Sequence, residues 1–475
     1  MSTQATLERR TPQFPADAGA SRPDPGRQWR QRARRAQALV LLLWSTGIAA
    51  GALALPTAMS TQPGDFGGVM TGIGILFGLV GTDLLLVMIV LAARIPVIDR
   101  TIGHDRAIAV HRSLGKPVLY LLLAHTIFLL IGYGASQGID PVSEIGSMLA
   151  IPDLPLAFLA MGGLLVVVVT SVVAVRRRFS YEAWYLIHLL GYVAVLIAIP
   201  HELSVGGVLA DGSLQRAYWI SLYIIAFGAV FAYRFVEPII SSLRHRIRVE
   251  RVEVLAPGVT SIHLRGRNLA ALDAAGGQFF VWRFWTARTW WHSHPISLSA
   301  PPRHDAARIT VRASGDGTRA ISAVRPGTRV TIEGPYGMFT QAARTSPKLA
   351  IIAAGIGITP VRAMLEKADL GPRETIVLLR ASTDADTALW EETIALAKRK
   401  GAVVYTMIGP RSRRGPTWMS ESDERRGVTL RSVFPDLATS DLYVCGPADW
   451  IDLVEADARA NGLAPHQIHT ERFEW

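Results

Sequence analysis

Four histidines lie in two long apolar segments, HRSLGKPVLYLLLAHTIFLLIGYG and YEAWYLIHLLGYVAVLIAIPHEL: His111, His125, His188 and His201. An ionisable ring inside a membrane-length segment is costly and normally faces the protein interior for a functional reason. Two helices with one histidine near each end could hold two hemes, each iron bound by imidazole from both sides. The first pair is 14 residues apart, roughly 21 Å along a helix, within a hydrocarbon core of ~30 Å. The pattern indicates an electron path across a membrane.

A second interpretation has to be weighed for each histidine. A single histidine near a helix end is more often an interfacial residue than a ligand, and His201 taken alone fits that description. Two pairs at similar spacing favour the heme sites. His188 and His201 are 13 residues apart, which turns their rings about 140° away from each other on an ideal helix. Because Pro200 removes a helical hydrogen bond just before His201, we expect a local distortion to re-aim that ring.

The 475 residues divide into segments of different texture. Residues 1–36 are rich in Arg, Pro, Ala and Gln and predict a disordered cytoplasmic tail, and no cleavable signal is expected. Residues 37–236 predict a bundle of six membrane helices, at 37–56, 68–93, 114–135, 155–175, 182–200 and 216–236. Short alternating segments in 244–342 predict an antiparallel β-barrel. In 347–475, apolar runs alternate with helical patterns, which predicts an α/β domain with a parallel sheet.

The charged and sulfur-containing residues narrow the function further. The net charge is +11, but arginines crowd the flanks of the apolar segments and form no single basic face, which argues against nucleic-acid binding. By the positive-inside rule the chain is a multi-pass cell-membrane protein with both termini cytoplasmic, His111 and His188 near the inner surface and His125 and His201 near the outer. The single cysteine, Cys445, excludes an intrachain disulfide and a c-type heme attachment, so any heme is b-type.

Two glycine motifs could hold phosphates. Gly355-Ile356-Gly357-Ile358-Thr359-Pro360 follows a predicted strand and opens a predicted helix, where backbone N–H groups can approach a pyrophosphate; the alternative is a plain strand-to-helix turn. Gly315-Asp316-Gly317-Thr318 could seat a diphosphate in the same way, or be an ordinary β-turn.

Two further motifs accompany them. His294-Pro295-Ile296-Ser297 lies in the predicted barrel, and Cys445-Gly446-Pro447 ends an apolar strand, at the sheet edge where ligands usually bind. Cys445 by itself fits a small buried residue as well as a reactive thiol.

The chain resembles the ferric reductase and NADPH oxidase superfamily over about residues 37–475. The resemblance lies in the order of its motifs, which are the paired histidines, HPxS, GxGxTP, CGP and a terminal aromatic residue. The cytoplasmic half is similar to ferredoxin–NADP reductases. The resemblance implies an inner heme on His111 and His188, an outer heme on His125 and His201, and an FAD. The family's spacing on the fifth helix is also near 13.

The resemblance also assigns roles to the motifs. It places Ser297 near the reactive edge of the flavin and His294 near the polar tail of FAD, with Pro295 and Ile296 between them. It assigns Gly315, Gly317 and Thr318 to the FAD pyrophosphate. It assigns Gly355, Gly357, Thr359 and Pro360 to the pyridine nucleotide, with Cys445, Gly446 and Pro447 beside the nicotinamide. Trp475 would stack on the flavin until nicotinamide displaces it. Ile296 departs from the family's Phe or Tyr and cannot stack on a flavin face.

Other residues leave alternatives open. Arg380, and Arg411, Arg413 and Arg414 further on, suit a 2′-phosphate and favour NADPH over NADH, although the last three also fit a solvated loop. Asp83 lies within the second membrane helix, either as an internally bonded group or as one that tunes a heme or moves protons. Arg94 and Arg112 could pair with heme propionates or reflect topology alone.

The sequence therefore predicts a flavocytochrome b oxidoreductase that passes electrons from cytosolic NADPH through FAD and two b-type hemes to an external acceptor. Ferric chelates are favoured because the turn after His125, TIFLLIG, is apolar; dioxygen, giving superoxide, is the alternative. Two other hypotheses are an electron-conducting subunit for a partner protein and a transporter gated by a nucleotide-sensing module.

Overall fold

The computed structural model describes residues 24–60, 65–205 and 207–473. Six helices in these ranges are long and apolar enough to cross a membrane: α1 Pro25–Ser60, α2 Phe66–Ala92, α4 His104–Gln137, α6 Leu154–Ser171, α8 Tyr181–Ser204 and α9 Leu214–Phe231. They confirm the six expected helices and make the chain a multi-pass membrane protein. One boundary differs: residues 25–36, expected in the disordered tail, are the start of α1, while residues 1–23 of that tail lie outside the described residues.

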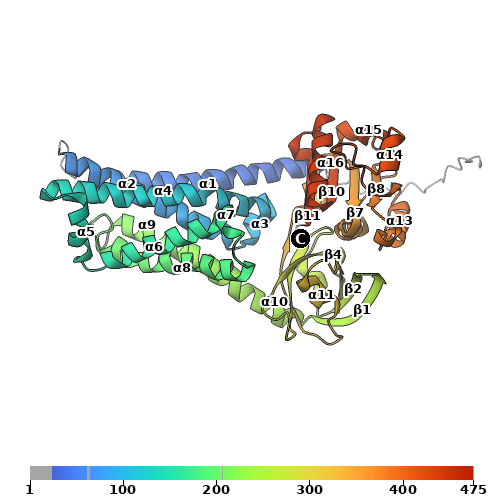
Figure 1. The fold of residues 1–475 in the computed structure, drawn as a ribbon, viewed down its shortest axis with the longest axis horizontal. Helices are drawn as coiled ribbons and strands as arrows, with labels where there is room; N and C mark the ends of the chain where they lie inside the picture. Colours follow the sequence, from blue (N-terminus) through green and yellow to red (C-terminus); the bar gives the residue numbers. More distant parts are fainter. Residues whose placement is uncertain (1–23, 61–64, 206, 474–475) are drawn as a thin grey trace, which may run out of the picture.

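Shorter helices complete the bundle. α3 (Pro96–Ile102) links α2 to α4, α5 (Pro141–Leu149) links α4 to α6, and α7 (Val173–Arg176) follows α6. A π-helical turn at Ala232–Val236 joins α9 to α10 (Glu237–His245), which leads into the first strand. Figure 1 shows the bundle at one end of the molecule and the strands at the other, with α5 at the far end of the bundle.

Glycines on α2 let α4 approach it closely. A Cβ atom added at Gly74 or Gly81 would come within 2.9 Å of side-chain atoms of Leu129 or Leu122 on α4. Small residues that allow such backbone approach are typical of helix pairs in membranes. The contact brings backbone carbonyls of α2 within reach of the α4 histidines.

The six-stranded antiparallel sheet has the order β1-β2-β5-β4-β3-β6. Its strands are β1 Arg248–Ala256, β2 Val259–Arg265, β3 Phe279–Phe284, β4 His294–Ala300, β5 Ala306–Arg312 and β6 Val330–Tyr336, with α11 (Asp316–Ser322) between the last two. Phe280, Trp282 and Phe284 of β3 are fully buried in its core. This is the expected barrel.

The five-stranded parallel sheet has the order β11-β10-β7-β8-β9, which confirms the α/β domain. Its strands are β7 Lys348–Ala354, β8 Thr375–Ala381, β9 Val403–Ile408, β10 Ser440–Pro447 and β11 Ile468–Phe473. The helices around it are α12 Ile358–Lys367, α13 Trp390–Arg399, α14 Glu421–Arg425, α15 Leu430–Val433 and α16 Ala448–Ala460. Apolar clusters cover both faces of the sheet, as expected for parallel strands.

The three parts are in direct contact. Arg308 and Arg312 of the barrel pair with Glu392 and Asp386 of the α/β domain at 2.7 and 2.6 Å. The N-terminal end of α1 extends past the bundle to the junction of the barrel and the α/β domain (Figure 1), where the Arg32 guanidinium donates to the Ala342 carbonyl at 3.2 Å. The barrel and the α/β domain are together called the flavin module below.

Candidate heme, flavin and nucleotide sites

The four histidines of the bundle form two pairs, each with one ring from α4 and one from α8. The ring centres of His111 and His188 are 6.0 Å apart. Two imidazoles that share one metal ion through ~2 Å bonds have ring centres roughly 6 Å apart. His125 and His201 both line a largely apolar cavity of about 180 Å³. Each pair therefore offers the two imidazoles that one heme iron needs.

The rings are oriented by groups from neighbouring helices. His111 Nδ1 lies 3.0 Å from the Met88 carbonyl oxygen and His125 Nδ1 lies 2.8 Å from the Gly74 carbonyl oxygen, both on α2. Because a carbonyl only accepts, each Nδ1 carries the proton and each Nε2 is left for iron. His188 Nδ1 lies 3.2 Å from Ser171 Oγ. His201 Nδ1 is buried without a hydrogen-bond partner.

The two pairs lie at different levels of the bundle. The pair of His111 and His188, called the proximal pair, is two helical turns from His104, which contacts the flavin module. The pair of His125 and His201, called the distal pair, shares its cavity with Met148 of α5, at the opposite end (Figure 1). α8 runs unbroken through Pro200 to Ser204, so the second ring reaches the cavity from a continuous helix.

Gly78 makes room for the distal pair, and replacing it gives a first prediction. A Cβ atom at Gly78 would lie 2.5 Å from His125 Nδ1. We expect Gly78→Val to displace the His125 ring and remove the distal heme, so that heme per flavin falls by about half. Gly162→Val is the matched control, because a Cβ atom there meets nothing within 4 Å. Heme and flavin absorbance measure both; an unchanged ratio in Gly78→Val would contradict the assignment.

The flavin motifs meet at the barrel surface. His294 opens β4 and packs on the first turn of α11, where a Cβ atom at Gly317 would lie 2.4 Å from His294 Cε1. His294 Nε2 and Ser297 Oγ are buried without a partner, as expected of atoms that await a ligand. Burial, followed by the neighbouring His292, lowers the pKa of His294. The Thr318 hydroxyl accepts from the Ser314 and Gly315 N–H groups at 3.0 Å, so it shapes this turn.

The remaining two residues of the HPIS motif are less buried. Pro295 is exposed and Ile296 is half-buried against the barrel core, while its carbonyl accepts from Trp282 Nε1 at 2.9 Å. Ile296 is therefore anchored in the barrel by its backbone.

The nucleotide motifs also come together. Gly355 has a φ of +54° and Gly357 faces the end of β10, where an added Cβ atom would lie 2.4 Å from the Cys445 carbonyl oxygen. α12 begins at Ile358, directly after this turn, so Thr359 and Pro360 lie in its first turn. Cys445 is fully buried and burial raises the pKa of its thiol well above the ordinary value. It is therefore a neutral thiol beside the predicted nicotinamide position, with Gly446 and Pro447 after it.

A line of paired residues connects the two motif groups. In the sheet registers Ser297 pairs with Phe279, and Phe279 with Tyr336. A Cβ atom at Gly337, the next residue, would lie 3.7 Å from Glu471 Oε2, and Glu471 pairs with Cys445 in the parallel sheet. The barrel and the α/β domain thus converge between the HPIS motif and Cys445.

Sequence reasoning missed two residues of this convergence. Glu471 is buried, and Phe473 ends β11 opposite Pro447 and packs against the cluster that contains Cys445. The spacing of an acid and an aromatic residue in the last strand was the available signal. Trp475, predicted to stack on the flavin, lies outside the described residues.

Glu471 predicts a pH dependence of stability. Burial, followed by repulsion from Asp105, raises its pKa from 4.5 to about 8. A carboxyl group whose folded pKa is raised binds its proton more tightly in the folded state. Its contribution is therefore complete below pH 4.5 and is lost as the pH rises toward about 8.

We expect Glu471→Gln to flatten the fall in Tm between pH 5 and 8, as measured by thermal unfolding in detergent. Glu391→Gln, at an exposed position on α13, is the control and should follow the wild-type slope. An identical slope in Glu471→Gln and wild type would contradict the assignment.

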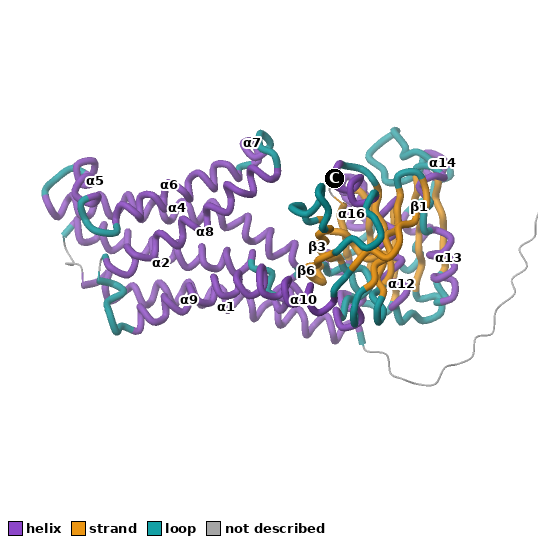
Figure 2. The backbone as a smooth tube through the Cα atoms, turned by 90° about the horizontal axis from the view of Figure 1, so that it is seen from below, coloured by secondary structure: helices purple, strands orange, loops and turns teal. Residues whose placement is uncertain are grey.

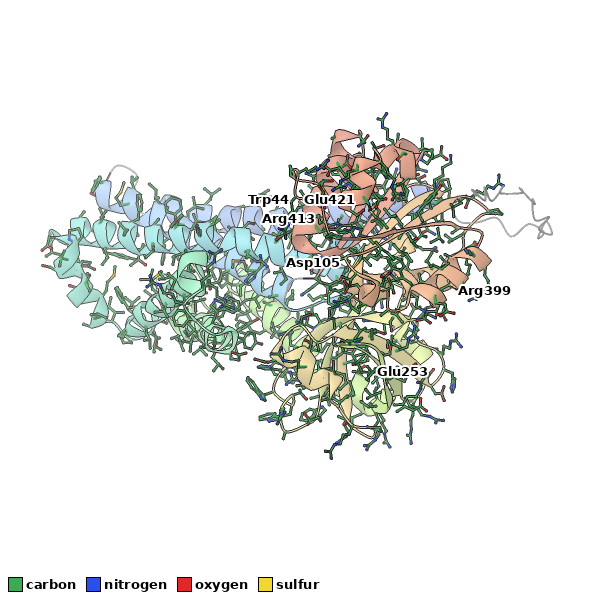
Figure 3. All side chains as sticks on the ribbon, turned by 45° about the vertical axis from the view of Figure 1, so that its right-hand side comes forward. Trp44, Asp105, Glu253, Arg399, Arg413 and Glu421 are labelled. Carbon is green, nitrogen blue, oxygen red and sulfur yellow. The ribbon has the colours of Figure 1, made fainter. Side chains whose placement is uncertain are left out.

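The bundle and the barrel meet at a mostly buried ion pair. Arg94, after α2, pairs with Glu333 of β6, and its guanidinium carbon lies 5.3 Å from the centre of the Tyr336 ring. His104 contacts the same ring, with centres 5.4 Å apart, and Arg234 Nη1 lies 3.8 Å from Glu333 Oε2. Arg94 thus binds the barrel. Figure 2 shows β3 and β6 on the side of the barrel that faces the bundle, and Figure 3 places Asp105 at the same junction.

Two other residues singled out by sequence are also placed. Asp83 is buried and accepts a hydrogen bond from Thr46 of α1 at 3.2 Å, so it is internally bonded. Arg380, the last residue but one of β8, is almost fully buried, and its guanidinium donates to the Ala381 carbonyl while its Nε has no partner.

Residues 77–199 match the family described as ferric reductase like transmembrane component, and residues 351–456 match the oxidoreductase NAD-binding domain. A flavohemoprotein of Oceanobacillus iheyensis is 26% identical over 228 residues, which are 45% of this chain and 55% of that protein. The chain thus spans about half the length of this relative. Ferredoxin–NADP reductase B of Sorangium cellulosum is 30% identical over 193 residues, 37% of this chain and 75% of that protein.

A solved structure, the flavohem-like FAD/NAD-binding domain of nitric oxide dioxygenase from Vibrio cholerae, covers 48% of this chain and 98% of its own, at 23% identity and a TM-score of 0.39. The two family matches and the reductase of Sorangium cellulosum together identify both halves of the chain. It belongs to the flavin oxidoreductases of the ferredoxin–NADP reductase type, and it joins their FAD- and NAD(P)-binding module to a ferric reductase-like transmembrane component.

Proposed function

We propose that this NAD(P)H-dependent flavin oxidoreductase moves electrons from NADPH to ferric chelates on the opposite side of the membrane, using FAD and two b-type hemes. FAD, when bound, would supply the conversion of a two-electron hydride into single electrons for heme iron, which protein side chains do not supply. The proposal depends on one observation above all. The bundle holds two histidine pairs at two levels, and the proximal pair lies toward the flavin module.

The protein's own residues bind, orient and exclude water. Carbonyls of Met88 and Gly74 hold the α4 imidazoles with Nε2 free, and Ser171 does the same for His188. His294 and the turn at Gly317 would hold the polar tail of FAD, and Ser297 Oγ would meet its reactive edge. Gly355 and Gly357 would let the backbone approach the nucleotide, beside Cys445.

The orientation follows from the charges that flank the helices. Arginines gather at the end of the bundle that carries the flavin module, while acidic residues predominate in the loops at the other end. By the positive-inside rule the flavin module is cytoplasmic, the proximal pair is the inner one and the distal pair the outer one.

The preference for NADPH depends on Arg380. Its unpartnered Nε near the end of β8 suits a phosphate, and burial lowers the pKa of the guanidinium while the charge of Asp423 opposes that shift. We expect Arg380→Ala to raise the KM for NADPH about tenfold more than the KM for NADH, the worth of one charge-assisted hydrogen bond. Arg399→Ala, at the exposed end of α13 (Figure 3), should leave the ratio unchanged. Equal effects of Arg380→Ala on both nucleotides would remove the residue from the site.

The distal cavity favours a chelate that takes electrons at its mouth over an acceptor that needs polar groups inside. Its one acidic residue, Glu202, accepts hydrogen bonds at 2.9 Å from Trp219 Nε1 and the Tyr223 hydroxyl. The carboxylate is therefore occupied by protein donors, and most of the remaining lining is apolar.

The acceptor is tested on one membrane preparation. NADPH-driven reduction of a ferric chelate and superoxide output are measured side by side. The proposal expects iron reduction that persists when superoxide dismutase is added. Strong superoxide formation with no direct iron reduction would replace ferric chelate by dioxygen as the acceptor.

A further inference from the structure

The loop between β3 and β4, residues 285–293, carries three indoles on its surface. Trp285, Trp290 and Trp291 are 50%, 53% and 49% exposed, although tryptophan is ordinarily well buried. Exposed aromatic residues on one short segment mark a binding surface. Because an indole has an apolar body and a polar N–H group, it suits a boundary between apolar and aqueous surroundings. The flavin and nucleotide motifs leave these three residues unexplained.

The loop is a built turn, held by its own hydrogen bonds. The buried Thr289 hydroxyl donates to the Phe284 carbonyl at 2.7 Å, and the Trp290 N–H donates to the Thr286 carbonyl at 3.1 Å. Arg283 donates to the Trp290 carbonyl at 3.1 Å. The indoles are therefore presented by a defined backbone.

Contacts place this loop at the membrane boundary. His292 Nε2 lies 3.1 Å from Glu182 Oε1, and Glu182 is the first residue of the apolar span in α8. On the other flank, Trp285 Nε1 donates to Thr331 Oγ1 of β6, the strand against which α10 packs. α10 continues the last membrane span and exposes an apolar face of Ile239, Ile240 and Leu243. The loop thus lies between two elements that enter the lipid.

The surrounding charges suit phospholipid headgroups. Arg288 is exposed within the loop, and Arg177 and Arg178 are exposed just before α8. Tryptophan concentrates at membrane–water interfaces, and nearby arginines are attracted to anionic lipids. We propose that the β3–β4 loop is a lipid-binding surface, whose indoles lie in the headgroup region of the leaflet on the flavin-module side. It would hold the barrel against the bilayer beside its contact with the bundle.

The test uses the full chain in lipid nanodiscs with one reporter thiol. The only native cysteine, Cys445, is fully buried, so Ala287→Cys in the loop can be labelled selectively with an environment-sensitive fluorophore. Val254→Cys is the control, 74% exposed on β1, which lies away from the bundle (Figure 1). Lipids with a spin label near the headgroup serve as quenchers. We expect quenching at position 287 to be at least about twofold stronger than at 254, because interfacial groups enter the headgroup–acyl boundary by ~5–10 Å.

A second variant separates lipid binding from a role in the flavin site. Adding Trp290→Ala and Trp291→Ala to Ala287→Cys should lower the quenching toward the value at position 254, with flavin content unchanged. Equal quenching at 287 and 254 would overturn the proposal. Unchanged quenching with loss of FAD would also overturn it, by assigning the indoles to the flavin. Neither outcome depends on the acceptor or the heme count.

Discussion

His188→Ala is expected to lower NADPH-driven reduction of an external acceptor by roughly 100-fold or more, because a heme at the proximal pair would lose one of the two imidazoles proposed to hold it. Replacing an outer partner of a metal ligand alone typically costs 10–100-fold, and this change removes the ligand itself. The His188 ring lies 6.0 Å from that of His111, and in the described bundle no other histidine of α8 is at this level. Heme absorbance and acceptor reduction, measured on the same membranes, check the expectation.

Two controls for this change test whether the flavin module still works. His304→Ala alters an exposed histidine of the barrel and should leave both readouts at the wild-type value. Reduction of ferricyanide, which takes electrons directly from flavin, should stay intact in His188→Ala. Full transmembrane reduction by His188→Ala would show that electrons do not pass through the proximal pair.

Arg94→Glu is expected to slow reduction of the proximal heme about tenfold or more while hydride transfer from NADPH to flavin stays normal. The Arg94 and Glu333 side chains are only 19% and 20% exposed, and reversing one charge leaves two carboxylates facing each other. Breaking a buried pair typically costs ~3–5 kcal/mol, enough to populate arrangements in which the barrel is detached from the bundle. Stopped-flow absorbance at the flavin and heme bands separates the two steps.

Charge exchange provides the matched test of that junction. Arg94→Glu combined with Glu333→Arg restores opposite charges at the same positions, and we expect partial recovery of the heme reduction rate. Arg234 remains near position 333 and would then oppose the new arginine, so recovery is not complete. A rate in the double variant no higher than in Arg94→Glu would contradict the role of the pair. An unaltered rate in Arg94→Glu would contradict it as well.

The fold was predictable because its signals are long or repeated. Membrane-length apolar runs predicted the six helices, and strand periodicity predicted a barrel followed by a parallel sheet. The prediction that the first helix begins at residue 37 was wrong, because residues 25–36 gain order from tertiary contacts, such as that of Arg32 with Ala342. Local composition carries no record of such a distant partner.

The candidate sites were predictable to a different depth. The sequence supplied the histidines and the glycine motifs, and the structure brings His111 to His188, His294 to Gly317 and Gly357 to Cys445.

The sequence could not show which groups orient these site residues. The carbonyl that holds His125 belongs to Gly74, 51 residues earlier, and is defined only once α2 and α4 pack. Arg94 was expected to serve topology or a heme propionate, whereas its partner Glu333 is 239 residues away.

Counting cofactors in the purified protein tests the central claim most directly, since each histidine pair is assigned one b-type heme. Iron, extractable heme and FAD are measured on one preparation, with the absorbance spectrum before and after reduction by NADPH. We predict two non-covalent hemes per FAD, both with the sharp reduced bands of bis-imidazole ligation. A preparation with normal flavin and no heme, or with a single heme that survives replacement of either pair, would contradict the account.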